Sequence, residues 1–228
     1  MSWIYEITLQ GPAGAAAALG DWFAGGPRDA LAKLPGLVSL DTYVGSGGTA
    51  GDPYNNDGHG PSMIIVAEFT SRAALAAAIG DIAAAIGPLP NHVSATGAAM
   101  ERLYYPVAGG REPAPLEAPL SYVVRYRRPA EDEEAFRANY IATHPVTQGE
   151  MPNIRAVMCY LPLDDLRHPH FADANYLIGN EVVFDSIEHL STSMQSPVRE
   201  ELRRHYREFP PFSGAVTHFA MQRTRHAG

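Results

Sequence analysis

Two residues of one predicted helix have side chains suited to proton transfer. Tyr140 and His144 are four positions apart, so they lie on the same face of a helix. An imidazole can take or give a proton near neutral pH, and a phenol can donate a hydrogen bond to a substrate oxygen. Pro145 is expected to end the helix, which leaves His144 at a C-terminus, where the helix dipole favours an imidazolium. The alternatives are a capping histidine and a core tyrosine, neither with a part in catalysis.

Two charged residues at predicted strands could complete such a site. Arg155 opens the strand after the helix, and a guanidinium near His144 would bind a carboxylate or a developing enolate. Glu181 lies in an otherwise apolar strand, where a buried and unpaired carboxylate is costly. It could set the tautomer of His144 or contact the substrate. The alternatives are an ordinary ion pair for Arg155 and a solvent-facing position for Glu181.

The other candidates are histidines in the two long loops that connect strands. His59 lies in the first loop, and His168 and His170 lie in the second. Long loops often carry function, so we expect these three side chains to line the mouth of a substrate site. A metal centre would need one or two ligands more than the pair His168 and His170 supplies. We therefore expect neither a metal nor another cofactor.

Composition excludes several classes of protein. The chain has 228 residues, 46% of them hydrophobic and 18% charged, which is enough for a real core. A net charge of −8 without a basic stripe argues against nucleic acid as a partner. The single cysteine, Cys159, rules out an internal disulfide and a Cys-rich metal site. No apolar stretch is long enough to cross a membrane, and the first residues lack the basic and then apolar pattern of a signal peptide, so we expect a cytoplasmic protein.

Periodicity and propensity predict the elements that must position these residues. In the first half the pattern predicts strands over 2–10, 37–44, 62–69 and 97–105, and helices over 14–23 and 72–86. In the second half it predicts strands over 120–128, 155–161, 176–184 and 215–222, a helix over 130–143, and one or two helical segments over 185–207. Each half therefore has the order βαββαβ.

The two halves are joined by a linker and resemble one another. Residues 106–119 contain four prolines and two glycines. We place the units at 1–106 and 120–228, with a linker over 107–119. The motif at 34–37 can be laid on the one at 151–154, 117 positions later, without a gap. The order βαββαβ is the ferredoxin-like unit. The sequence thus predicts an α+β protein of two fused ferredoxin-like units, whose sheets pack together as an intramolecular pseudo-dimer.

Motifs of the second half follow an order that is known from one family. They are Tyr140-x3-His144-Pro145, Met151-Pro152-Asn153-Ile154-Arg155, Glu181-Val182-Val183-Phe184-Asp185-Ser186 and Ser196-Pro197. This set, over about residues 120–222, resembles the EthD family of the dimeric α/β-barrel superfamily. Asn153 stands where that family usually has glycine, but asparagine tolerates the left-handed conformation next best.

The resemblance implies an intramolecular dimeric α/β-barrel with one competent and one degenerate half. In the first half, Phe23, Pro27 and Val38 stand 117 positions before Tyr140, His144 and Arg155, so that half lacks the candidate chemistry. The superfamily includes cofactor-independent monooxygenases, lactone isomerases, polyketide cyclases and some haem enzymes. What the resemblance implies is therefore a fold and a pocket more than one reaction.

From the residues and the resemblance together we expect a small-molecule enzyme of catabolic or secondary metabolism. His144 would move a proton next to a carbonyl of an apolar, aromatic or polyketide-like substrate, and Tyr140 or Arg155 would hold the developing oxyanion. The reaction would be an isomerisation, cyclisation, elimination or cofactor-free oxygenation. The alternatives are a haem-binding oxidoreductase with a histidine ligand and a non-catalytic small-ligand-binding protein. Two such chains could also associate as a homodimer.

Overall fold

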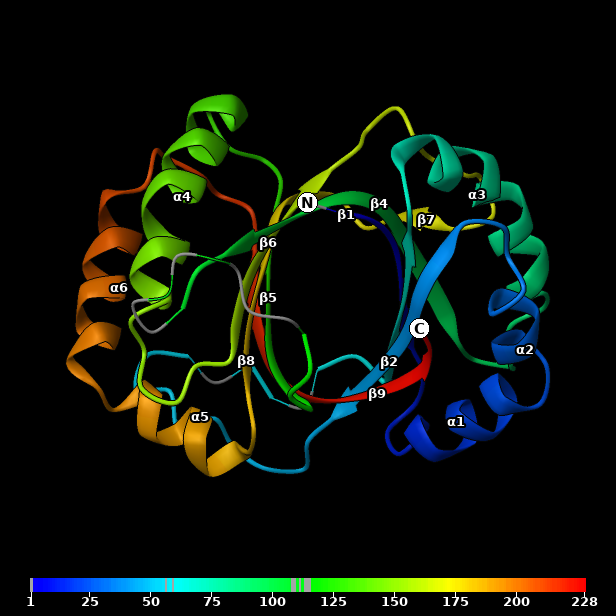
Figure 1. Cartoon of the computed structure of the whole chain (residues 1–228), viewed down its shortest axis with the longest axis horizontal. Coiled ribbons are helices and arrows are strands. Elements are labelled where there is room, and N and C mark those ends of the chain that lie inside the picture. Colours follow the sequence, from blue (N-terminus) through cyan, green and yellow to red (C-terminus); the bar gives the residue numbers. More distant parts are fainter. Residues whose placement is uncertain (1, 56, 59, 108–109, 111, 113–115) are drawn as a thin grey trace.

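The chain folds around a closed antiparallel barrel of eight strands (Figure 1). The computed structural model describes residues 2–55, 57–58, 60–107, 110, 112 and 116–228. Helices cover the outside of the barrel on two opposite sides, three from each half of the chain. The predicted α+β class is therefore confirmed. Within the described residues, none of the helices combines the length and the apolar character needed to cross a membrane.

The first half of the chain forms one side of the barrel. Its elements are β1 (Ser2–Gln10), α1 (Ala16–Ala24), α2 (Pro27–Leu31), β2 (Leu37–Gly45), β3 (Met63–Phe69), α3 (Arg72–Ile86) and β4 (Ser94–Tyr105). The strands pair in the order β4-β1-β3-β2. The bounds of β1 and α3 agree with those predicted from periodicity, whereas the single turn of α2 was not predicted.

The second half forms the other side and pairs its strands in the corresponding order, β9-β5-β8-β6. Its elements are β5 (Leu120–Arg127), α4 (Glu133–Gln148), β6 (Ala156–Pro162), β7 (Ala172–Asp173), β8 (Tyr176–Phe184), α5 (Ile187–Met194), α6 (Pro197–Glu208) and β9 (Val216–Ala227). Pairing of β2 with β9 and of β4 with β6 closes the barrel. The short β7, which was not predicted, pairs with β4.

The turns before β2 and β6 share one backbone conformation. Gly36 has φ of 77° and Asn153, 117 positions later, has φ of 61°. At Gly36 a Cβ atom would lie 2.9 Å from the Cβ of Ala74 on α3, so a side chain has no room there. The turn at Asn153 keeps the left-handed conformation that asparagine tolerates.

The core consists of one cluster inside the barrel and two clusters between the barrel and the helices, and successive residues of each strand alternate between inside and outside. On β1, Tyr5 and Ile7 face α1–α3, whereas Ile4 faces the barrel interior. On β8, Val182 faces α4–α6, whereas Val183 faces the interior. This alternation follows from the period of two in a strand. It also means that neighbouring residues of β8 belong to different environments.

Paired charges lie among the apolar side chains inside the barrel. Arg125 binds the carboxylate of Glu6 at 2.5 Å, and the hydroxyl of Tyr176 donates to the same carboxylate at 2.9 Å. Arg102 pairs with Glu68 at 2.5 Å. Each buried guanidinium therefore has an acid beside it, as burial of a charge requires.

The helix that carries the candidate histidine does not end where the sequence predicted. α4 continues through Pro145 to Gln148. A proline inside a helix leaves the carbonyl four residues earlier without its N–H donor, here that of Ile141. The hydroxyl of Tyr105, at the end of β4 from the other half, donates to the Ile141 carbonyl at 3.1 Å. That contact compensates for the missing bond, so His144 lies within the last turns of the helix and not at its end.

Candidate functional site

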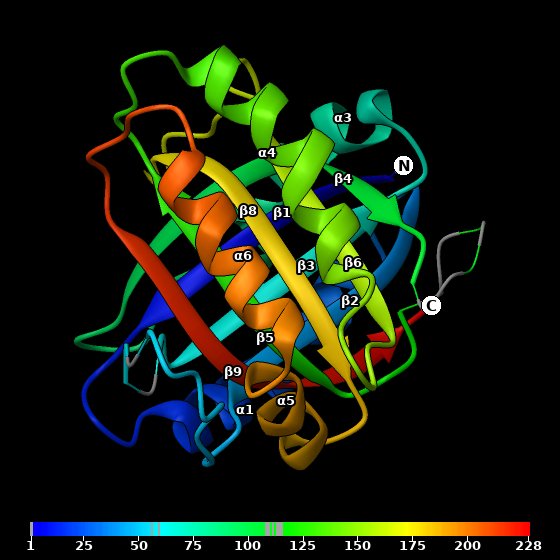
Figure 2. The same ribbon diagram turned by 90° about the vertical axis from the view of Figure 1, so that its left-hand side faces the viewer.

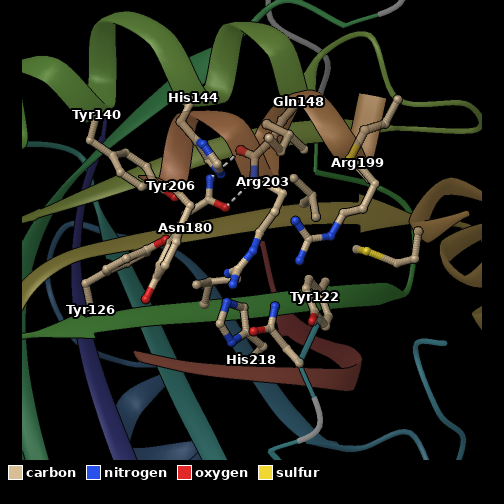
Figure 3. A pocket seen from close by; sticks show the side chains of 16 residues that line it. Tyr122, Tyr126, Tyr140, His144, Gln148, Asn180, Arg199, Arg203, Tyr206 and His218 are labelled. Atoms are coloured by element: carbon tan, nitrogen blue, oxygen red, sulfur yellow. Dashed lines mark hydrogen bonds between the residues drawn. The ribbon is translucent and has the colours of Figure 1, made fainter. Parts of the chain in front are cut away.

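Figure 2 shows α4 and α6 in front of strand β8. A cavity lies between these two helices and the outer face of the sheet formed by β8, β5 and β9 (Figure 3). Its volume is about 40 Å³. The residues that line it are Asn55, Tyr122, Val124, Tyr126, Tyr140, His144, Gln148, Met151, Asn180, Val182, Met194, Arg199, Leu202, Arg203, Tyr206 and His218. The lining contains two arginines, two histidines and four tyrosines but no aspartate or glutamate.

His144 and Tyr140 both line this cavity, from successive turns of α4 (Figure 3). Their ring centroids are 4.9 Å apart, and the ring of Phe209 lies 5.3 Å from that of His144. Among the described residues, Nδ1 of His144 has no hydrogen-bond partner, and the hydroxyl of Tyr140 has only the neighbouring hydroxyl of Tyr126 within reach. Native structures rarely leave a buried polar group such as Nδ1 of His144 unsatisfied, and a bound ligand could satisfy it.

The imidazole of His144 is neutral in this environment. Burial, followed by the electrostatic effects of the neighbouring His205 and Arg199, lowers its pKa from 6.5 to about 3. The helix dipole was expected to favour the imidazolium, but its effect is about 0.3–1 kcal/mol at an exposed site. Desolvation outweighs it, because a shift of this size corresponds to several kcal/mol. His144 can therefore accept a proton without first losing one.

An amide pair fixes the end of α4 on the sheet below. Gln148 and Asn180 of β8 exchange two hydrogen bonds of 2.8 Å, one from each amide nitrogen to the opposite oxygen. Asn180 also donates to the carbonyl of Met158 at 3.0 Å. These bonds position the helix so that His144, one turn before Gln148, faces the cavity.

A loop from the first half of the chain closes one wall of the cavity. The carboxylate of Asp52 accepts bonds of 2.8 and 2.9 Å from Arg199 of α6 and one of 2.9 Å from the hydroxyl of Tyr122. The Tyr54 N–H and the Asn55 amide donate to it as well. Burial raises the pKa of Asp52, but the bonds and charge of Arg199 outweigh burial and lower it. Asp52, which is not part of the cavity lining, therefore neutralises the charge of Arg199.

Among the residues that the structure describes, none of the acids pairs in this way with the second cavity arginine of α6. The guanidinium of Arg203 lies 5.2 Å from the ring centroid of Tyr54 and 4.9 Å from that of Tyr206. Across the cavity, Nδ1 of His218 contacts the carboxylate of Asp57 at 2.9 Å. Burial lowers the pKa of His218 despite that carboxylate. Beyond His218 the lining continues into a hollow of about 410 Å³, formed mainly by residues 45–50 and 57–58.

Two of the predicted site residues lie elsewhere. Arg155 is half exposed and pairs with Asp185 at 2.9 Å on the surface, so the structure does not bring it to His144. Glu181 points into the barrel, on the opposite face of β8 from the cavity. There it accepts a 2.5 Å bond from the Ser121 hydroxyl and another from the hydroxyl of Tyr160. Glu181 therefore neither faces solvent nor orients His144, because the pleat of β8 directs it inward.

The two loop histidines that the structure describes, His168 and His170, do not line the cavity either. His168 lines a different hollow of about 360 Å³, near the ends of β4 and β6, together with Tyr5 and Phe171. His170 is exposed in the same loop. His59 lies outside the described residues. Over the described part of the chain, no group of three or more His, Cys, Asp or Glu side chains could hold a metal ion.

Several cavity residues were not predicted from the sequence. Arg199 and Arg203 are four positions apart on α6, with Leu202 and Tyr206 beside them on the cavity side. This spacing is a visible signal of one helical face, although charged helices usually face solvent. Asp52 gave no local signal, because only the closed barrel brings the first loop over the second half.

Haem does not fit beside His144. Cofactor pockets measure roughly 300–1,000 Å³, whereas the cavity next to the imidazole has a volume of about 40 Å³. The ring of His144 is also packed against the rings of Tyr140 and Phe209. An axial bond to His144 would require these surroundings to be rebuilt.

Comparison with protein-family models and with curated proteins finds no match. Solved structures do match over nearly the whole chain. An "anthrone oxidase-like protein" is 15% identical with a TM-score of 0.63, and the match covers 100% of this chain and 94% of the other.

Two further structures carry the name "putative monooxygenase". The one from Fusobacterium nucleatum is 11% identical with a TM-score of 0.55, covering 98% of this chain and 92% of the other. The one from Lactobacillus acidophilus is 12% identical with a TM-score of 0.51, covering 100% and 95%. At such low identity these likenesses establish the fold alone. The chain thus has the fold of dimeric α/β-barrel proteins, closed within a single polypeptide.

Proposed function

We propose that this protein is a small-molecule enzyme that performs cofactor-independent proton transfer in the cavity between α4 and α6. The substrate is an apolar, aromatic or polyketide-like carbonyl compound. His144 takes a proton from the carbon next to the carbonyl, and Tyr140 donates a hydrogen bond to the oxygen that becomes negative. Return of the proton to another atom gives an isomerase or cyclase, and reaction of the carbanion with dioxygen gives an oxygenase.

We further propose that the chain is a fusion of two ferredoxin-like units, with the second unit of EthD type. The corresponding strand orders, β4-β1-β3-β2 and β9-β5-β8-β6, support this division. The boundaries are 1–106 and 120–228. The equivalent space in the first unit, between the sheet and α1–α3, is filled by apolar side chains such as Phe23 and Leu31. This supports a division of labour in which only the second unit carries chemistry.

One observation carries the catalytic proposal. A buried neutral imidazole, which has no partner on Nδ1 among the described residues, and a buried phenol, which has only the hydroxyl of Tyr126 within reach, line the same cavity. The phenol stays protonated, because burial raises the pKa of Tyr140 well above its usual value. The site thus offers a proton acceptor and a hydrogen-bond donor side by side. Positive charge near the cavity stabilises the enolate, and the negative charge of the enolate in turn stabilises the imidazolium that forms beside it.

A substrate larger than a few atoms must displace side chains to reach His144. The cavity itself is about 40 Å³, but it shares Asn55, Tyr122 and His218 with the hollow of about 410 Å³ beside it. Tyr206 of α6 is only partly buried and is the side chain best placed to move, whereas Arg203 also contacts the ring of Tyr54. Entry from the hollow would then bring the reactive carbon to the imidazole.

Anthrone is the first substrate to test, because one protein of the same fold is named anthrone oxidase-like. The reaction consumes anthrone and one dioxygen and yields anthraquinone and one water. His144 would remove a proton from the methylene carbon, leaving its electron pair on the enolate. Dioxygen then oxidises that carbon, with one oxygen atom kept as the new carbonyl and the other released as water. Turnover is followed by oxygen uptake and by the absorbance of anthraquinone.

His144→Gln is expected to lower kcat by about 100- to 10,000-fold, the usual contribution of a general base, with little change in KM. The matched control is His189→Gln, which changes a half-exposed histidine on α5. Circular dichroism establishes that both variants fold. Retention of full turnover by a folded His144→Gln protein would refute the assignment.

A non-catalytic ligand-binding protein is the second candidate. The observation in its favour is that no described acid lies within ion-pair distance of His144 to stabilise an imidazolium. A pKa of about 3 also makes the imidazole a weak base until an anion forms beside it. This candidate predicts that anthrone binds without turnover and that His144→Gln leaves its dissociation constant unchanged.

A further inference from the structure

We propose that the aromatic substrate of this cavity also carries a carboxylate group, which Arg203 binds; anthrone, which lacks that group, reports on the proton-transfer step alone. The proposal rests on the proposed function for the location of the site, and it adds the substrate class. Its basis is the imbalance between hydrogen-bond donors and acceptors around the cavity, and the position of the one arginine that no described acid neutralises.

The lining supplies positive charge but no negative charge. Arg199, Arg203, His144 and His218 line the cavity, and no aspartate or glutamate does. In the described structure, three of these four side chains are either paired with an acid or uncharged. Nη2 of Arg199 donates to both carboxylate oxygens of Asp52, His218 contacts Asp57, and His144 is uncharged because burial lowers its pKa.

Arg203 is the exception among the described residues. It makes no hydrogen bond and no ion pair with any of them, and its Nε is buried without an acceptor. On α6, Glu201 and Glu208 both bind Arg204, and Glu200, three positions before Arg203, makes no ion pair with it. A buried N–H without an acceptor is costly. The Nε edge of a guanidinium presents two parallel donors, which match the two oxygens of a carboxylate.

Two aromatic rings hold this guanidinium without neutralising it. Tyr54 of the first half and Tyr206 of α6 lie 5.2 and 4.9 Å from its central carbon. Such contacts fix the plane of the group and leave its edge available for hydrogen bonds. Figure 3 shows the side chain of Arg203 extending between His144 above and His218 below, into the space enclosed by the lining.

The rest of the lining selects for an aromatic body on the carboxylate. Tyr122, Tyr126 and Tyr140 contribute ring surfaces, and Val124 and Val182 contribute aliphatic ones. The amides of Gln148 and Asn180 bind one another and present no free group. A flat ring system that enters from the adjoining hollow of about 410 Å³ and displaces the side chains in its way would thus contact apolar surface while its carboxylate contacts Arg203.

Isothermal titration of the full chain with 2-naphthoate and with 2-naphthamide tests the proposal. The two probes have the same shape, but only naphthoate carries a charge. We expect naphthoate to bind about 10- to 100-fold more tightly than naphthamide, the usual effect of a charge-assisted pair. Arg203→Gln should abolish this preference and leave naphthamide binding within about threefold. The matched control is Arg204→Gln, one position along the helix and exposed, which should keep the preference.

Arg203→Lys serves as a second variant, because it keeps the charge and loses the planar fork. It should bind naphthoate with an affinity between those of the wild type and Arg203→Gln. Equal binding of the two probes by the wild-type protein overturns the proposal whether or not any variant folds. Absence of binding of both probes overturns it as well.

The two proposals can fail separately. His144→Gln should keep the preference for naphthoate while losing anthrone oxidation. If His144→Gln oxidises anthrone normally but the wild type prefers naphthoate, the catalytic assignment alone is wrong. If anthrone oxidation depends on His144 but naphthoate and naphthamide bind equally, the carboxylate assignment alone is wrong.

Discussion

The neutral state of His144 should be measurable as a pH-dependent loss of stability. The pKa of this imidazole is about 3 in the folded protein, against 6.5 for an unperturbed histidine. Below about pH 6.5 the unfolded chain binds a proton at this position and the folded chain does not. The free energy of unfolding therefore falls as the pH is lowered from about 6.5 towards about 3, and it is unaffected by His144 at higher pH.

The magnitude follows from the size of the shift. One pKa unit corresponds to about 1.4 kcal/mol, so His144 should cost the wild-type protein about 2 kcal/mol between pH 7 and pH 5. His144→Phe removes the titrating group and keeps a ring against Tyr140 and Phe209. Its free energy of unfolding should thus fall by about 2 kcal/mol less than that of the wild type over the same range. All other ionisable groups are common to the two proteins.

Urea denaturation followed by far-ultraviolet circular dichroism at pH 7, 6 and 5, at constant ionic strength, provides the free energies. Circular dichroism is preferred to fluorescence, because both tryptophans, Trp3 and Trp22, lie in the first half of the chain. His170→Phe, which changes an exposed histidine, is the control and should follow the wild type. Parallel pH profiles for His144→Phe and the wild type would show that the imidazole is not held neutral. The argument from burial and the neighbouring cations would then fail.

Two other contacts give sharp expectations. Tyr105→Phe removes the donor to the Ile141 carbonyl and should lower the free energy of unfolding in urea by about 1 kcal/mol. In a Pro145→Ala background the backbone N–H at position 145 returns, so the same change should cost less. Equal costs in the two backgrounds would disprove that the Tyr105 hydroxyl replaces the missing N–H donor. Glu181→Gln replaces an acceptor of two hydroxyl groups inside the barrel with a group that can accept only one of them, and it should cost about 1–3 kcal/mol in the same assay. A cost near zero would mean that Glu181 is not held as the structure places it.

The local pattern of the sequence was sufficient for most elements and for the core of the candidate site. Strand bounds at 2–10 and 176–184 follow from period-two alternation and apolar runs, which depend on near neighbours. The pairing of Tyr140 with His144 on one helical face is likewise local, since positions four apart meet on any helix. Both lie in the cavity for that reason.

Helix length and side-chain direction were not determined locally. Pro145 predicts a helix end, and only a hydroxyl from the other half of the chain allows α4 to continue. Glu181 was interpreted as a partner of His144, but the register of β8 in the barrel turns it inward, one residue away from Asn180 on the cavity side. In a strand the facing direction changes at every residue, so it depends on pairing that only the closed sheet specifies.

The sequence by itself determined the class of fold, the order of elements and the helix face that carries His144, because each depends on residues a few positions apart. Only the tertiary structure decided the charge of the cavity. Asp52 reaches Arg199 across about two thirds of the chain and neutralises it, while Arg203, one turn further along α6, meets aromatic rings and no described acid. Which of two similar arginines stays available to a ligand depends on contacts between the halves of the barrel, and those contacts exist only once the barrel has closed.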